Sequence, residues 1–108
     1  MKQSFLLHIN ASNSLAVAFE EIMFLSSLKA NQLGEICDDI YIMEIKLSNN
    51  DITYPEQTTA LVKMHAQKGE YIGFSNGNHW ESSLNRAFEN IKQQFRILAN
   101  FRVQENTD

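Results

Sequence analysis

The chain has 108 residues, of which 44% are hydrophobic and 20% charged, and its formal net charge is -4. This composition is typical of a single globular domain with one hydrophobic core, and no apolar run approaches the roughly 18 residues needed to span a bilayer. The one cysteine, Cys37, excludes an internal disulfide, and the N-terminus has too few apolar residues for a secretory signal peptide. We therefore expect a cytoplasmic protein that makes no contact with a membrane.

The first part of the chain predicts a strand followed by a helix. Residues 4–9 predict a short strand, and the polar residues after it provide N-cap candidates for a helix from Leu15 to about Ala30. Gly34 is expected to break this helix. One face of the helix has apolar residues at the spacing of 3.6 residues, and these are Leu15, Ala18, Phe19, Ile22 and Leu25.

A second apolar stripe on this helix lies nearly opposite the first, and it consists of Val17, Phe24 and Leu28. Such a stripe is unexpected in a helix that packs on one side of a sheet. Neighbouring loops that cover the stripe are the simpler explanation. A surface for a protein partner or for a second copy of the chain is the alternative.

The middle of the chain predicts three strands, at residues 40–48, 57–66 and 70–75, because apolar and polar residues alternate there. Residues 49–56, which include the only proline, predict a loop. In the first of these strands we expect one side to carry Tyr41, Met43, Ile45 and Leu47, and the other Ile40, Ile42, Glu44 and Lys46. In the second we expect Ala60, Val62, Met64 and Ala66 to face inward, and Leu61, Lys63 and His65 to face outward.

The segment GFSNGNHWESSLNRAFENI, which begins at Gly73, predicts a tight corner between the last strand and a second helix. Asn78 and Glu81 have the spacing of a capping box, in which the two side chains satisfy exposed backbone N–H groups. Apolar residues then repeat at intervals of three and four, so the helix is predicted to run from Trp80 to about Phe101.

The element order β-α-β-β-β-α predicts an α+β two-layer sandwich. Two helices with apolar stripes would cover one face of a four-stranded sheet and leave the opposite face to solvent or a partner. Residues 1–102 are expected to form this single domain, and residues 103–108 a short acidic tail.

No arrangement of residues typical of an enzyme is present. The three histidines lie in separate predicted elements, and the carboxylates of Asp38 and Asp39 would raise the pKa of Cys37, the wrong direction for a nucleophile. No second cysteine and no paired histidine spacing indicates zinc, and the aspartates lack the pattern of a calcium loop. We therefore expect a protein that is not an enzyme and has no metal or cofactor.

The charge is unevenly distributed along the chain. Residues 1–56 have three lysines against eight carboxylates, a net of -5, whereas residues 57–104 have six cations against three carboxylates, a net of +3. A polyanion would approach the second half, although solvated surface charges explain the same pattern. The residues that we expect to contact RNA, through shape and phosphate groups, are Lys46, Lys63, Lys68, Arg86, Lys92 and Arg96.

The segment ALVKMHAQKGEYIGFSNGNHWESSLNRAFENIKQQF, which begins at Ala60, resembles the ribosome hibernation-promoting factors, also called the ribosome-associated inhibitor or sigma-modulation family. Positions that match the family's turn and last helix are Gly69, Leu84, Asn85, Ile91, Gln94 and Phe95. The chain departs from the family at the corner, where His79, Trp80 and Glu81 stand, and at two usually basic positions, which are Asn90 and Gln93.

The resemblance implies a protein that docks in the tRNA and mRNA channel of the small ribosomal subunit. There it would contact the rRNA backbone and block translation in starved or stationary cells, as part of a stress response. The alternative is a protein-interaction or homodimeric module on the same fold that binds no nucleic acid. An enzyme or a small-ligand binder whose pocket leaves no motif is the third hypothesis.

Overall fold

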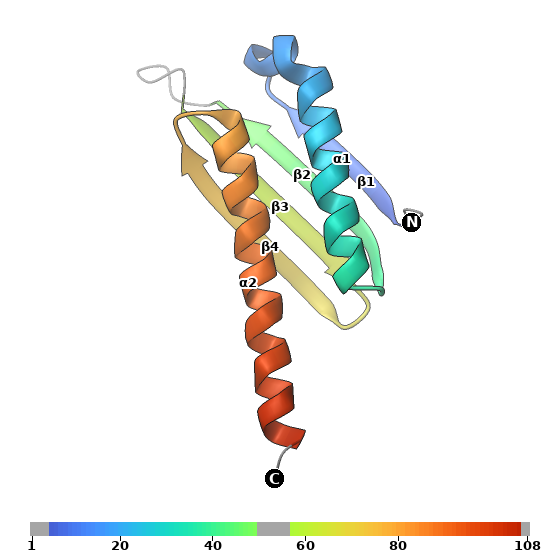
Figure 1. Cartoon of the computed structure of the whole chain (residues 1–108). Helices are drawn as coiled ribbons and strands as arrows, with labels where there is room; N and C mark the ends of the chain where they lie inside the picture. The colour runs from blue at the N-terminus through green and yellow to red at the C-terminus, as the bar shows by residue number, and fades with distance from the viewer. Residues whose placement is uncertain (1–4, 50–56, 107–108) are drawn as a thin grey trace.

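The computed structural model describes residues 5–49 and 57–106, with side chains up to Arg96. The predicted element order is confirmed, and Figure 1 shows the elements in place. They are β1 (Leu6–Ala11), a short 3-10 helix η1 (Asn13–Ala18), α1 (Phe19–Ile36), β2 (Ile40–Ser48), β3 (Thr58–Ala66), β4 (Gly69–Gly77) and α2 (Trp80–Asn106). Residues 50–56 of the predicted loop at 49–56 and the last two residues of the predicted tail lie outside the described residues.

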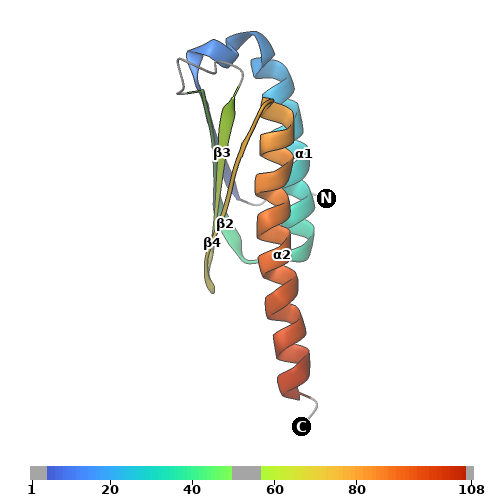
Figure 2. The same cartoon turned by 90° about the vertical axis from the view of Figure 1, so that its left-hand side faces the viewer.

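The four strands form one sheet in the order β1-β2-β3-β4. β1 is parallel to β2, and the other two pairs are antiparallel. A parallel pair needs a crossover connection, which η1 and α1 provide. Figure 2 shows both helices on the same side of the sheet, so the predicted α+β two-layer sandwich is confirmed.

The core lies between the sheet and the two helices. Alternate residues of each strand point to the helices, and one row across the sheet consists of Ile9, Ile45, Val62 and Gly73. From the helices, Ile22, Leu33, Leu84 and Phe88 are buried against these strands. The inward positions predicted for β3 are all buried, which confirms the prediction for that strand.

α2 lies directly on β4, and Gly73 allows this close approach. A Cβ atom on Gly73 would lie 2.0 Å from the carbonyl oxygen of Ala87. At the start of the helix the buried Ser83 hydroxyl donates a hydrogen bond of 2.8 Å to the carbonyl of Thr58. At Gly73 the backbone of β4 therefore lies directly against the backbone of α2.

α2 also bonds to the outer edge of β4. The side-chain amide of Asn90 donates to the carbonyl of Phe74 at 2.6 Å, and that of Gln94 donates to the carbonyl of Ile72 at 2.8 Å. Because an edge strand with unpaired carbonyls can recruit another strand, these two amides protect this edge from such pairing.

The bounds of the first helix differ from the prediction. η1 occupies the residues from Asn13, α1 begins only at Phe19, and it continues through Gly34 to Ile36. The predicted break at Gly34 is wrong: α1 passes through this residue, and the ring of Phe5 packs beside it, so that a Cβ atom there would lie 3.0 Å from the ring.

The predicted sides of Ile40 and Tyr41 are reversed in the structure. The pairing of β2 with β3 shifts between Ile40 and Ile42, so Tyr41 is an extra residue in a β-bulge. As a result Ile40 is buried and Tyr41 is half exposed. Beyond the bulge the prediction is confirmed, with Met43 and Ile45 in the core.

The corner before α2 is built around His79 rather than Asn78. α2 begins at Trp80, and His79 Nδ1 accepts a hydrogen bond of 3.2 Å from the N–H of Glu81. The hydroxyl of Ser82 donates to the His79 carbonyl at 3.1 Å. The predicted cap is therefore wrong by one residue. The helix ends at Asn106 rather than near Phe101, since no glycine or proline interrupts this segment.

Candidate nucleic-acid interface

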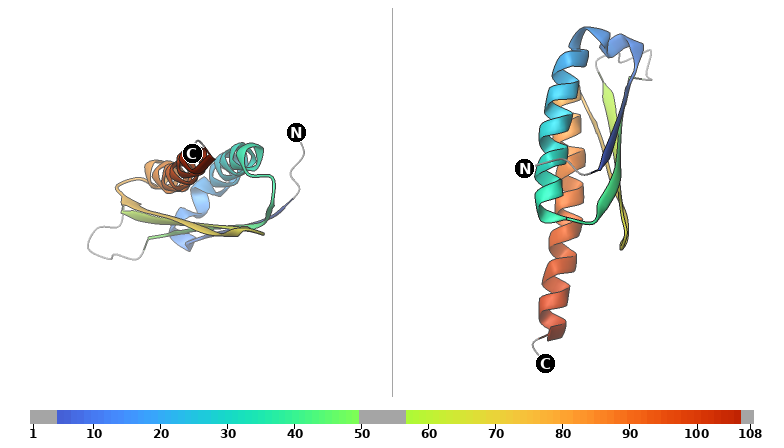
Figure 3. Two further views of the ribbon diagram at one scale, coloured as in Figure 1. Left: turned by 90° about the horizontal axis from the view of Figure 1, so that it is seen from below. Right: turned by 90° about the vertical axis from the view of Figure 1, so that its right-hand side faces the viewer.

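No helix or strand of the described residues covers the face of the sheet opposite the helices, as the prediction required (Figures 2 and 3). We call it the open face. It is built from three rows that run across the four strands: Leu6, Ile42, His65 and Glu70; His8, Glu44, Lys63 and Ile72; and Asn10, Lys46, Leu61 and Phe74.

The open face combines cations with exposed apolar side chains. Leu61, Lys63 and His65 face it from β3, which confirms their predicted outward direction. Phe74 lies next to Leu61 and is 56% exposed, and Ile72 lies next to Lys63. An exposed aromatic ring beside lysines on a sheet is an arrangement that can stack on an unpaired base while cations contact phosphates.

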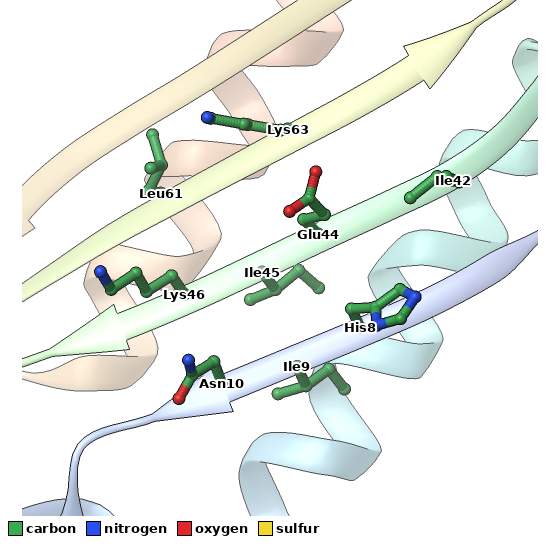
Figure 4. A pocket seen from close by; sticks show the side chains of 9 residues that line it. All are labelled: His8, Ile9, Asn10, Ile42, Glu44, Ile45, Lys46, Leu61 and Lys63. Atoms are coloured by element: carbon green, nitrogen blue, oxygen red, sulfur yellow. The ribbon is translucent and has the colours of Figure 1, made fainter.

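A shallow hollow of about 730 Å³ lies over β1, β2 and β3 on this face (Figure 4). Lys46 and Lys63 come from adjacent strands, and Figure 4 shows their side chains extending toward the same end of the hollow, with Leu61 between them. Lys46 pairs with Leu61 in the sheet register, so Lys63 is its diagonal neighbour. The residues that line the hollow are His8, Ile9, Asn10, Ile42, Glu44, Ile45, Lys46, Leu61 and Lys63.

His65 engages the two carboxylates of the open face. Its Nε2 lies 2.6 Å from Glu44 Oε2, and its Nδ1 lies 3.0 Å from Glu70 Oε2. A neutral imidazole has one N–H and donates to one of them, whereas an imidazolium donates to both. Glu44 stands opposite Lys63 in the sheet register, yet its short contact is with His65. None of the ion pairs among the described side chains involves Lys46 or Lys63.

The other four predicted cations lie elsewhere. Lys68 is at the turn between β3 and β4, where its backbone N–H donates to Asp39 at 3.2 Å. Lys92 and Arg96 lie on α2 in the helix layer, where Lys92 Nζ is 3.6 Å from a carboxylate oxygen of Glu89. Arg86 is exposed on α2 as well. The structure thus brings together Lys46 and Lys63 and separates them from the remaining four.

Sequence reasoning missed the aromatic and aliphatic part of the open face. Ile72 and Phe74 alternate with the inward Tyr71 and Gly73 along β4, so the period of two residues was the available signal. Their position beside Lys63 and Leu61 follows only from the register of the β3–β4 hairpin.

The residues predicted as a partner surface are exposed. Val17 is fully exposed on η1, and Phe24 and Leu28 on α1 are 72% and 45% exposed. In the described part of the chain no loop covers this stripe, which contradicts the simpler explanation.

Cys37 is a buried thiol that is hydrogen-bonded to Asp39. Burial raises its pKa to about 11, and its hydrogen bond of 3.0 Å to Asp39 acts in the same direction. The same hydrogen bond, together with the Lys68 N–H, holds the pKa of Asp39 below its usual range. Among the described residues no group of three or more metal-ligating side chains is placed to bind an ion. No helix in the described ranges is long and apolar enough to cross a bilayer.

We expect the folded protein to react slowly with iodoacetamide at Cys37. The thiolate is the reactive form, so raising the pKa from 9.0 to about 11 lowers the thiolate fraction at pH 8 by roughly 100-fold. Mass spectrometry of alkylation should show a rate in the folded protein that still rises about tenfold per pH unit above pH 9. The urea-unfolded chain is the control, because its rate should level off there. Equal alkylation rates in the folded and the unfolded chain would contradict the raised pKa of Cys37.

Comparisons with known proteins identify the fold. No known protein family matches the sequence, and no curated protein matches it. Among solved structures, the chain is similar to a ribosomal subunit interface protein from Coxiella burnetii, with a TM-score of 0.58 and 10% sequence identity. The match covers 92% of this chain and 99% of that protein's chain. The chain therefore has the same fold as a ribosomal subunit interface protein, over nearly the full length of both.

Proposed function

We propose that the protein binds the small ribosomal subunit and inhibits translation, with Lys46 and Lys63 of the open face contacting rRNA phosphates. The observation that carries this proposal is the fold shared with a ribosomal subunit interface protein over 92% of the chain. The resemblance of the last two strands and the last helix to the hibernation-promoting factors points in the same direction. An inhibitor that acts by occupying a channel needs no catalytic group.

The open face supports contact with RNA through its geometry. Diagonal side chains on neighbouring strands are about 7–8 Å apart, so Lys46 and Lys63 can contact phosphates of one RNA segment. Glu44 and Glu70 both contact the imidazole of His65, so the ammonium groups of Lys46 and Lys63 are available to phosphate. Phe74 adds a ring on which an unpaired base can stack.

The net charge of -4 limits the strength of this interaction. Each phosphate contact contributes roughly 0.7 to 0.9 to the slope of log affinity against log salt concentration. Two lysines therefore account for a slope of about 1.4 to 1.8, so a fourfold rise in salt concentration is expected to lower the affinity about tenfold.

Co-sedimentation with purified small subunits over a range of salt concentrations tests the proposal. We expect Lys46→Gln/Lys63→Gln to lower the affinity at least tenfold at low salt, and to reduce the salt slope by about 1.4 to 1.8. The matched control is Asn13→Asp/Asn31→Asp, which changes the net charge equally at two exposed positions of η1 and α1. An in vitro translation assay with the same variants measures inhibition.

Two results would contradict this assignment in different ways. A wild-type protein that does not sediment with the subunit at low salt ends the ribosomal proposal. The variant Lys46→Gln/Lys63→Gln could instead keep the wild-type affinity while Lys92→Gln/Arg96→Gln loses it. That result would show that the rRNA contacts lie on the helix layer and not on the open face.

A protein-interaction module without nucleic-acid binding is the second candidate, and the exposure of Phe24 and Leu28 favours it. Substitutions in these residues would then abolish function, while the two lysine substitutions would leave it intact.

A further inference from the structure

The outer side of the helix layer contains a groove between α1 and α2, which run side by side in the same direction (Figure 1). At the end where both helices begin, a hollow of about 450 Å³ is lined by Glu20, Glu21, Phe24, Leu25, Trp80 and Glu81. Further along, a hollow of about 480 Å³ is lined by Gln32, Ile36, Lys92, Phe95 and Arg96. We call the two together the helix groove.

The α1 wall of the helix groove is apolar and uncovered. Phe24 lines the first hollow, Leu28 follows it by one turn and lies between the two hollows along α1, and Ile36 lines the second hollow. They are 72%, 45% and 51% exposed. Large apolar side chains that are grouped and exposed mark an interaction surface.

The two ends of the helix groove carry opposite charges. The first end has three exposed carboxylates, which belong to Glu20, Glu21 and Glu81. The second end has the cations Lys92 and Arg96, and Glu89 pairs with the first of these at 3.6 Å. The exposed guanidinium of Arg96 therefore provides the free positive charge of that end.

Leu28 lies midway between these ends. It follows Glu20 by eight residues and precedes Ile36 by eight, which corresponds to about 12 Å in each direction along the helix. A two-fold axis through Leu28 would bring the acidic end of one groove opposite the basic end of another. A surface with this pattern is complementary to itself, as an isologous dimer interface requires.

We propose that the helix groove binds a second copy of this chain in an antiparallel, two-fold symmetric arrangement. Leu28 packs against the partner's Leu28, Phe24 lies opposite the partner's Gln32, and Glu81 faces the partner's Arg96. The open faces of both copies then point away from the interface. The dimer is consequently compatible with RNA binding at the open face and does not depend on it.

Sedimentation equilibrium over a range of protein concentrations tests the dimer. The wild-type chain, whose mass is 12.4 kDa, is expected to form a species of twice that mass. Leu28→Asp places a carboxylate at the symmetry axis, and we expect it to raise the dimer dissociation constant at least tenfold. The matched control is Met23→Asp, because Met23 is exposed to a similar degree on α1 but lies about 140° around the helix from Leu28. Circular dichroism melting checks that both variants fold.

A charge exchange tests the antiparallel arrangement itself. Glu81→Arg puts like charges at both ends of the dimer and is expected to raise the dissociation constant severalfold at low salt, with a smaller effect at high salt. Glu81→Arg/Arg96→Glu restores opposite charges at both ends and should restore wild-type dimerisation. A monomer at every concentration would overturn the proposal. So would a dimer that tolerates Leu28→Asp, or one that the double exchange does not restore.

Discussion

The variant Gly73→Ala is expected to lower the free energy of unfolding by about 3 kcal/mol. The added Cβ would lie 2.0 Å from the carbonyl oxygen of Ala87 and 2.9 Å from its carbonyl carbon. Both atoms belong to the backbone of α2, so no side-chain rotation relieves the contact. The helix has to move away from β4, and the buried surface between them is partly lost.

Urea denaturation followed by circular dichroism measures this effect, with Gly34→Ala as the matched control. At Gly34 the nearest atom is 3.0 Å away and belongs to the ring edge of Phe5, which can shift. Alanine is also favoured over glycine inside a helix by about 1 kcal/mol. We therefore expect Gly34→Ala to change the free energy of unfolding by no more than about 1 kcal/mol. Equal effects of the two substitutions would show that α2 does not lie as close to β4 as described.

Phe88→Ala is expected to lower the free energy of unfolding by about 4 kcal/mol. Phe88 is 1% exposed and is one of the largest fully buried side chains, located where α2 meets the sheet. Removing the ring loses its transfer free energy and leaves a cavity that the surrounding backbone cannot close.

The same substitution at Phe74 is the control, because it differs mainly in burial. Phe74 is 56% exposed on the open face, and its loss is expected to cost less than about 1 kcal/mol. Urea midpoints of the two variants can be compared directly when the slopes of the transitions agree. A large effect at Phe74 would show that the open face is covered, and the proposed RNA interface would then be excluded.

Local patterns in the sequence determined the element order and the fold class. The period of two residues in a strand and 3.6 residues in a helix are properties of a short segment, and they survive without knowledge of the rest of the chain. The outward direction of Lys63 and His65 and the burial of Met64 followed from this alternation alone. The long apolar repeat after Trp80 likewise predicted α2.

The local predictions failed at positions whose structure depends on contacts between residues that are distant in the sequence. Tyr41 is displaced outward by a bulge that exists only in the pairing of β2 with β3. α1 continues through Gly34, and the ring of Phe5, far away in the sequence, packs beside this glycine. The residue pattern of one segment contains no information on the pairing with β3 or on the position of Phe5. Neither the side of Tyr41 nor the end of α1 could therefore be predicted from it.

The tertiary structure alone decided which functional residues share a surface. The sequence identified six cations as candidates for RNA contact and two apolar stripes on α1, but not which of the cations lie together or which stripe is covered. The sheet register places Lys46 diagonally from Lys63, and His65 draws Glu44 away from them. The packing of both helices on one side of the sheet leaves Phe24 and Leu28 exposed. Surfaces are assembled from segments that are distant in the chain, and only the packing of those segments brings their side chains together.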